Sequence, residues 1–161
     1  MRATSAMFLV LIISAGVFAQ SFAQPKGIRT FQFEKKEGSH TARLVFQTKL
    51  FARAKHGSTR VVRGQTMVDG RPAIGTDGNI PGAEIDSMKF YLDGKQITIP
   101  RRLYADCFDP NFGDDYVTLK FGQGFRSVIV SMSGSDGAGG YQAIWRLRKD
   151  GRHRRTIIPG G

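Results

Sequence analysis

The chain has 161 residues, with 24 Lys and Arg against 13 Asp and Glu, which gives a formal net charge of +11. It contains one cysteine and three histidines, and 40% of its residues are apolar. This composition excludes a disulfide scaffold, a multi-domain assembly and a polytopic membrane protein. A cysteine-rich zinc site is also excluded, because one Cys and three scattered His cannot supply its ligands.

Residues 1–23 have the features of a cleaved secretory signal peptide. Arg2 precedes an apolar run of 12 residues at positions 7–18, which is shorter than the about 20 residues that cross a membrane. Small residues then favour cleavage after Ala23, with Ala19 as the second choice. We therefore expect an exported protein, secreted or periplasmic, with a single β-rich domain over residues 24–161 and no membrane span in the mature chain.

Apolar and polar residues alternate through much of this domain, which is typical of strands. The first strands are expected at residues 30–34, 41–53 and 59–62, whereas residues 64–83 have little periodicity and predict a long loop.

Three hairpins are predicted after that loop. One spans residues 88–99 with a type I′ turn at Asp93-Gly94, and one spans 117–132 through a Gly-rich connection. The third turns at Asp150-Gly151, a register that places Arg146 opposite Arg155 and Arg148 opposite His153.

Only residues 100–108 are predicted as helix, because Pro100 suits a first helical turn and the apolar residues after it share a face. Cys107 lies on that face, where we expect a small buried hydrophobe rather than a catalytic thiol. About eight or nine short strands and one short helix predict a mainly β domain, an antiparallel sandwich or barrel.

The densest charge lies in the last hairpin. Its candidate anion-binding residues are Arg146, Arg148, Lys149, Arg152, His153, Arg154 and Arg155. Like charges across a strand pair are destabilising, and a bound polyanion would relieve them. The same residues also suit an edge strand protected against aggregation.

Charge along the mature chain falls in blocks. Residues 26–75 carry 11 basic and 3 acidic residues, residues 76–125 carry 5 and 8, and residues 126–161 carry 7 and 2. If the two basic blocks meet in space, the combined patch is large enough to steer a polyanion. The Gly-rich residues 133–140 are either a further anion-binding nest or a strand connection.

Acidic residues gather in the predicted loops. They are Asp69, Asp77, Glu84, Asp106, Asp109, Asp114 and Asp115. No metal site is assigned. Asp69, Asp77, Glu84 and Asp109 are weak candidates for Ca²⁺ ligands, because they supply carboxylate oxygens but do not have the spacing of an EF-hand. Local ion pairs of Asp69 with Arg71 and of Asp106 with Arg102 are the alternative, and a glycosidase pair of carboxylates is another.

The leading hypothesis is an exported, non-enzymatic binding or envelope-associated module with a basic surface for an anionic polymer or a protein partner. It has no catalytic residue and no cofactor assigned, since the chain lacks a nucleophile elbow and a nucleotide-binding loop. The alternatives are a secreted hydrolase that uses loop carboxylates and a nucleic-acid-binding small barrel. Export makes the last one the least favoured, and the oligomeric state is left open.

Overall fold

A computed structural model of the chain describes residues 27–113 and 115–160. The predicted signal peptide and its cleavage site lie outside these residues. The described part is mainly β, with 56% strand, three antiparallel sheets and no closed barrel. The prediction of a mainly β chain is therefore confirmed.

The first four-stranded sheet has the order β1-β2-β6-β7. Its strands are β1 (Ile28–Glu37), β2 (His40–Leu50), β6 (Ala83–Leu92) and β7 (Lys95–Ile97). The alternation seen in the sequence places Phe33, Leu44, Phe46 and Phe90 on one buried face.

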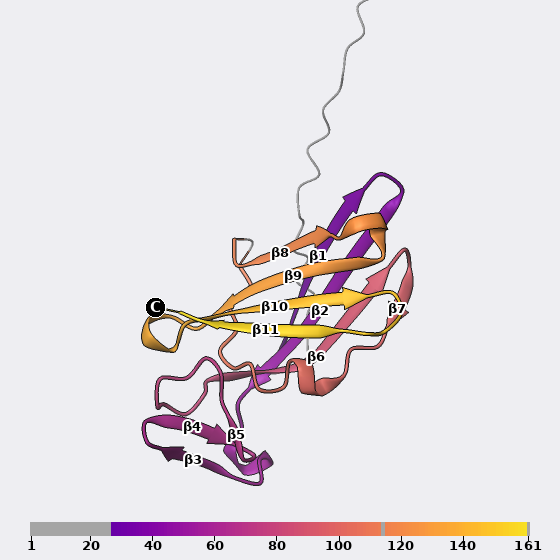
Figure 1. Cartoon of the computed structure of the whole chain (residues 1–161). Coiled ribbons are helices and arrows are strands. Elements are labelled where there is room, and N and C mark those ends of the chain that lie inside the picture. The colour runs from indigo at the N-terminus through magenta and orange to yellow at the C-terminus, as the bar shows by residue number, and fades with distance from the viewer. Residues whose placement is uncertain (1–26, 114, 161) are drawn as a thin grey trace, which may run out of the picture.

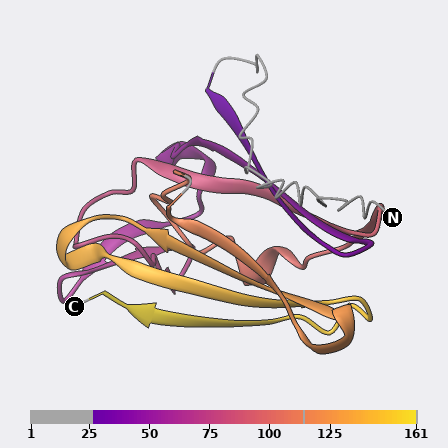
Figure 2. The ribbon, with the colours of Figure 1, turned by 90° about the horizontal axis from the view of Figure 1, so that it is seen from above.

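The second sheet has the order β11-β10-β9-β8. Its strands are β8 (Val117–Phe121), β9 (Ser127–Gly134), β10 (Tyr141–Arg148) and β11 (Arg154–Pro159). The two sheets form two layers (Figure 2), and their inner faces share one apolar core that includes Phe46, Val130 and Trp145. Most of the hydrophobic stabilisation of the fold comes from this cluster.

Two predicted hairpins are confirmed. Asp93 and Gly94 both have positive φ, 52° and 79°, and Phe90 pairs with Ile97 as the type I′ turn requires. Strands β8 and β9 form the second, joined through the 3-10 helix η3 (Gln123–Phe125).

The predicted helix at residues 100–108 is wrong, because only a 3-10 helix, η2 (Arg101–Leu103), forms there. The later backbone groups pair with other segments: Ile74 donates to the Asp106 carbonyl, and Phe108 donates to the Ile74 carbonyl. These partners replace the hydrogen bonds that a helix would make along itself. The prediction that Cys107 is buried is confirmed.

The predicted long loop at residues 64–83 is also wrong in part. It contains β4 (Gln65–Val68) and β5 (Arg71–Pro72), which join β3 (Thr59–Val62) in a third sheet with the order β3-β4-β5. This small sheet lies below the two main layers in Figure 1. The expected strand at 41–53 ends at Leu50, and η1 (Arg53–Lys55) follows it.

The remaining 3-10 helix is η4 (Gly137–Gly139), in the connection between β9 and β10. Within the described residues, no helix is both long enough and apolar enough to cross a membrane.

Candidate functional site: the basic hairpin and the outer face of its sheet

The register of the basic hairpin differs by one residue from the prediction. Arg146 pairs with Arg154, and Trp145 pairs with Arg155. The predicted turn fails because Asp150 does not take the positive φ that a type I′ turn requires, although Gly151 does, with φ 79°. Instead, the Asp150 Oδ1 atom accepts a hydrogen bond of 3.0 Å from the Arg152 N–H, which is the geometry of an Asx turn.

A shift of one residue moves every side chain of a strand to the opposite face. Arg155 therefore points toward the interior, with only 15% of its side chain exposed. Its guanidinium forms a bidentate ion pair with the Asp106 carboxylate and also donates to the Leu103 carbonyl at 3.2 Å. Hydrogen bonding to Asp106 raises the pKa of Arg155. Arg155 therefore does not share the exposed surface of Arg146 and Arg154.

His153 also stabilises the fold through hydrogen bonds to the backbone. Its Nδ1 atom accepts a hydrogen bond of 3.1 Å from the Arg148 N–H, and its Nε2 atom lies 3.0 Å from the Thr98 carbonyl oxygen. Both contacts are satisfied by the neutral ring with its proton on Nε2. The side chain thus ties the hairpin to the segment that follows β7.

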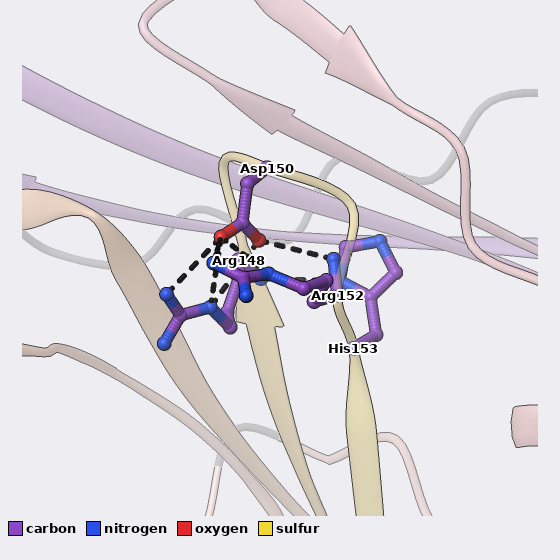
Figure 3. A network of polar contacts seen from close by, with 4 residues as sticks. All are labelled: Arg148, Asp150, Arg152 and His153. Atoms are coloured by element: carbon purple, nitrogen blue, oxygen red, sulfur yellow. Dashed lines mark hydrogen bonds and ion pairs between the residues drawn. The ribbon is translucent and has the colours of Figure 1, made fainter.

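Arg148 and Arg152 converge on one carboxylate (Figure 3). Nη2 of Arg152 lies 2.6 Å from Oδ2 of Asp150, and Nη2 of Arg148 lies 3.1 Å from the same oxygen. These hydrogen bonds, with Arg148 the larger cause, hold the pKa of Asp150 far below its ordinary range. The trio keeps a net charge of +1, and each guanidinium uses only Nε and Nη2 on Asp150. The Nη1 groups stay available to another acceptor.

The outer face of the sheet carries a row of cations. Lys120 pairs with Ile129, Ile129 with Arg146, and Arg146 with Arg154, so these residues form one line across all four strands. Lys120, Arg146 and Arg154 are exposed, and none of them forms an ion pair with another residue in the described part of the chain. We name these three residues the basic face.

Comparison with protein-family models, with curated proteins and with solved structures found no match. What the basic face can bind therefore follows from its own charges and neighbours. Sequence reasoning missed Lys120, because its strand carries no other cation and only the sheet order brings it into line with the hairpin.

Turns from both basic blocks lie at one end of the molecule (Figures 1 and 2). The turns β1–β2, β6–β7, β8–β9 and β10–β11 gather there (Figures 1 and 2). His40, beside the first turn, stacks on Phe125 of the third at 4.3 Å and bonds Asp93 of the second at 3.0 Å. The Lys149 N–H donates to the Arg126 carbonyl, which joins the fourth turn to the third.

Residues 133–140 are held by backbone hydrogen bonds at both ends. The N–H of Ser135 donates to the Asp109 carbonyl, and the N–H of Gly140 donates to the Gly137 carbonyl. Gly139 is buried, and a Cβ there would lie 3.1 Å from the carbonyl carbon of Thr76. These contacts fix the ends of the loop, whereas residues 136–138 at its middle are exposed.

Among the described loop carboxylates, Asp69 and Glu84 converge on His56, whereas the others have separate surroundings. Asp109 accepts the N–H groups of Gly82 and Ala83, at 2.9 and 2.8 Å, and Asp106 pairs with Arg155 instead of Arg102. Asp69 pairs with His56 instead of Arg71, at 2.8 Å. Asp77 and Asp115 are exposed and Glu84 is buried, whereas Asp114 lies outside the described residues.

These positions bear on the metal and hydrolase hypotheses. Among the described residues, no group of three or more His, Cys, Asp or Glu is arranged to hold a metal ion. The hydrogen bond from His56 lowers the pKa of Asp69, whereas a glycosidase general acid needs a raised pKa. Asp69 and Asp106 line one pocket, as a carboxylate hydrolase requires, but Asp69 is paired with His56 and Asp106 with Arg155.

Proposed function

We propose that this protein is an exported, non-enzymatic binding module that holds an anionic polymer on its basic face. The observation that carries the proposal is the row of Lys120, Arg146 and Arg154, three exposed cations in register without an ion-pair partner among the described residues. Arg146 and Arg154 are direct cross-strand neighbours, and such strands lie about 5 Å apart. Their repulsion, about 1 kcal/mol at that distance in water, is relieved when an anion lies between them.

The neighbouring row on the same face is rich in hydroxyl groups. Thr118 pairs with Ser131, Ser131 with Ile144, and Ile144 with Thr156. Hydroxyls donate to and accept from sugar and phosphate oxygens, so a polymer lying along the face meets cations on one side and hydrogen-bonding groups on the other. This combination favours an acidic polysaccharide over an isolated small ion.

The Arg148–Asp150–Arg152 trio lies at the end of the same hairpin. Asp150 orients both guanidiniums, which lowers the side-chain entropy lost when an anion binds to their remaining N–H groups. We therefore include Arg148 and Arg152 in the binding surface with Lys149, and exclude Arg155 and His153.

The test removes the basic face while keeping a matched control. The variant K120S/R146S/R154S loses three exposed strand cations, and the control K35S/R60S/K89S loses three exposed strand cations elsewhere. Both have the same net charge, so a difference between them reports position. Affinity for fluorescent heparin is measured by anisotropy over a series of salt concentrations.

We expect the basic-face variant to bind at least about tenfold more weakly than the control, at about 0.5 kcal/mol per lost contact. Its salt dependence falls as well, because fewer counterions are released. Equal affinities of the two variants overturn the proposal. Tighter binding of duplex DNA than of heparin by the wild type replaces the polysaccharide with a nucleic acid as the ligand.

Export is proposed from residues 1–23 alone. Expression of the full chain in a bacterium with a periplasm yields, on this proposal, a periplasmic product that begins at Gln24. The mass of the intact protein identifies the cleavage site. An uncleaved product that remains in the cytoplasm contradicts it.

A further inference from the structure

A pocket of about 370 Å³ lies away from the basic face, between the small sheet and the segment around η2. Val68 and Phe108 supply apolar lining, and both are buried. The lining also includes three exposed arginines from two separate segments, Arg71, Arg101 and Arg102. The volume is in the range of pockets that bind small organic molecules.

One wall of the pocket is held by a network of charged side chains. His56 lies with Nδ1 2.8 Å from Oδ2 of Asp69 and with Nε2 3.3 Å from Oε2 of Glu84. Glu84 is 3% exposed and is also contacted by Lys49. Since His56 follows η1, Asp69 follows β4 and Glu84 belongs to β6, the network joins the small sheet to the first main sheet.

The ring of Phe51 stacks on His56 at 4.6 Å and closes the network on one side. The Nε2 atom of His56 is buried and makes no hydrogen bond of acceptable geometry. The wall is thus held in place by contacts among its own side chains.

The carboxylates of the lining are already engaged. Asp69 is paired with His56, and Asp106 is paired with Arg155. The arginines are different: Arg101 has only a 3.3 Å hydrogen bond to the Asp86 carbonyl, and Arg71 and Arg102 have no hydrogen bond or ion pair from their side chains to another described residue. The lining therefore keeps an excess of positive charge next to an apolar surface.

We propose that this pocket binds a small organic anion, a molecule that carries a carboxylate or phosphate group beside an apolar portion. The anionic group lies against Arg71 and Arg102, because guanidinium matches both oxyanions with paired N–H donors. The apolar portion lies against Val68 and Phe108. This site goes beyond the polymer-binding function, since it is a concave site for one molecule on a different part of the fold.

The test uses phenyl phosphate and benzoate as probes, benzyl alcohol as the uncharged analogue and inorganic phosphate as the anion without an apolar part. Binding is followed by titration calorimetry and by the imidazole NMR signals of His56. His40 and His153, the other two histidines of the chain, lie outside the pocket lining and serve as internal references.

We expect phenyl phosphate or benzoate to bind with a Kd of about 5 mM or below, as befits a probe of this size, and to shift the His56 signals selectively. Benzyl alcohol and inorganic phosphate bind at least about tenfold more weakly, because the first lacks the anionic group and the second lacks the apolar portion. No binding of either charged probe overturns the proposal, and so does equal binding of benzyl alcohol.

Two variants separate the pocket from other surfaces. R71Q/R102Q weakens the charged probes at least about tenfold, whereas K55Q/R60Q, which removes two exposed cations outside the pocket lining, leaves them unchanged. A105F fills the pocket and abolishes binding without a change in charge. Wild-type affinity in folded R71Q/R102Q overturns the proposal even if A105F fails to fold. K120S/R146S/R154S retains full probe affinity, so this site and the basic face succeed or fail separately.

Discussion

Replacing Arg155 with methionine tests the register on which the basic face depends. The substitution keeps the aliphatic part of the side chain and removes a guanidinium that is held by Asp106 and by the Leu103 carbonyl. The Asp106 carboxylate, 20% exposed, then loses its ion-pair partner in a half-buried position. A carboxylate left there without hydrogen bonds is destabilising, because desolvation is no longer offset by a partner.

The magnitude lies between two limits. Breaking a fully buried ion pair costs about 3–5 kcal/mol, and losing an exposed pair costs about 0–1 kcal/mol. Since both side chains here are mostly but not fully covered, we expect a loss of about 2–3 kcal/mol in the free energy of unfolding. For a domain of this size that corresponds to a Tm lower by roughly 6–12 °C.

The assay is urea unfolding followed by tryptophan fluorescence. Trp145 is the only tryptophan of the chain, is fully buried and donates from Nε1 to the Leu103 carbonyl at 2.7 Å. Its emission therefore reports loss of the core beside the substituted residue. The wild type, R155M and R154M are compared under the same conditions.

R154M is the matched control, one position away on the opposite face. Arg154 is exposed and lies across from Arg146, so its loss relieves repulsion and changes the free energy of unfolding by less than about 0.5 kcal/mol. If R154M is the more destabilising variant, the hairpin has the two-residue turn, Arg155 faces outward, and the reasoning for the basic face is refuted.

Three further outcomes are expected. Burial raises the pKa of the Cys107 thiol to about 12, so a disulfide reagent labels it only in urea, and rapid labelling of the folded chain contradicts this. The hydrogen bond from His56 lowers the pKa of Asp69, so its stabilisation is lost as pH falls through the lowered value. The variant D69N therefore shows a smaller fall in the urea midpoint from about pH 6 to about pH 3, and an unchanged fall excludes this linkage. Thermal unfolding measures the third outcome. G75A is destabilised by more than about 2 kcal/mol, because residue 75 has a φ of 99° and the added Cβ would clash with the Phe108 carbonyl oxygen. G94A costs about 1–2 kcal/mol, because residue 94 has a φ of 79° but open space around it.

Two Asp-Gly pairs with the same local sequence signal form different turns, which marks the limit of prediction from the sequence. Asp93-Gly94 makes the predicted type I′ turn, with both residues at positive φ. Asp150 instead binds the Arg152 N–H and two guanidiniums through its carboxylate. These contacts favour a different backbone conformation and depend on residues outside the dipeptide, so the turn preference alone could not predict the register.

The small sheet had a signal that periodicity does not reveal. Asp69-Gly70 is a further pair with positive φ at both positions, 50° and 77°, and it joins β4 to β5 as a hairpin turn would. The two strands have only four and two residues, too few for an alternation to be recognised. At residues 100–108 the apolar spacing predicted a helix that does not form, because the backbone groups pair with distant segments instead.

The residues of the pocket lie far apart along the chain. Asp69 lies 13 positions after His56, whereas Arg101 and Arg102 come from a segment that was expected to be helical. The charge of these residues is visible in the sequence, but their convergence follows from the small sheet folding back onto β6 through His56 and Glu84. Without the third sheet there is no reason to place them together.

Folding redistributes the charge of the basic hairpin rather than displaying it. Arg155 forms an ion pair with Asp106, and His153 makes hydrogen bonds to two backbone groups. Asp150 neutralises half of the combined charge of Arg148 and Arg152. Among the described residues, the hairpin cations left without an ion-pair partner on the sheet face are Arg146 and Arg154, and the antiparallel order of β8 and β9 adds Lys120 to their row. The surface that can bind a polyanion is thus set by strand order and register, and a substitution that shifts the register by one residue would exchange Arg154 for Arg155 on that surface.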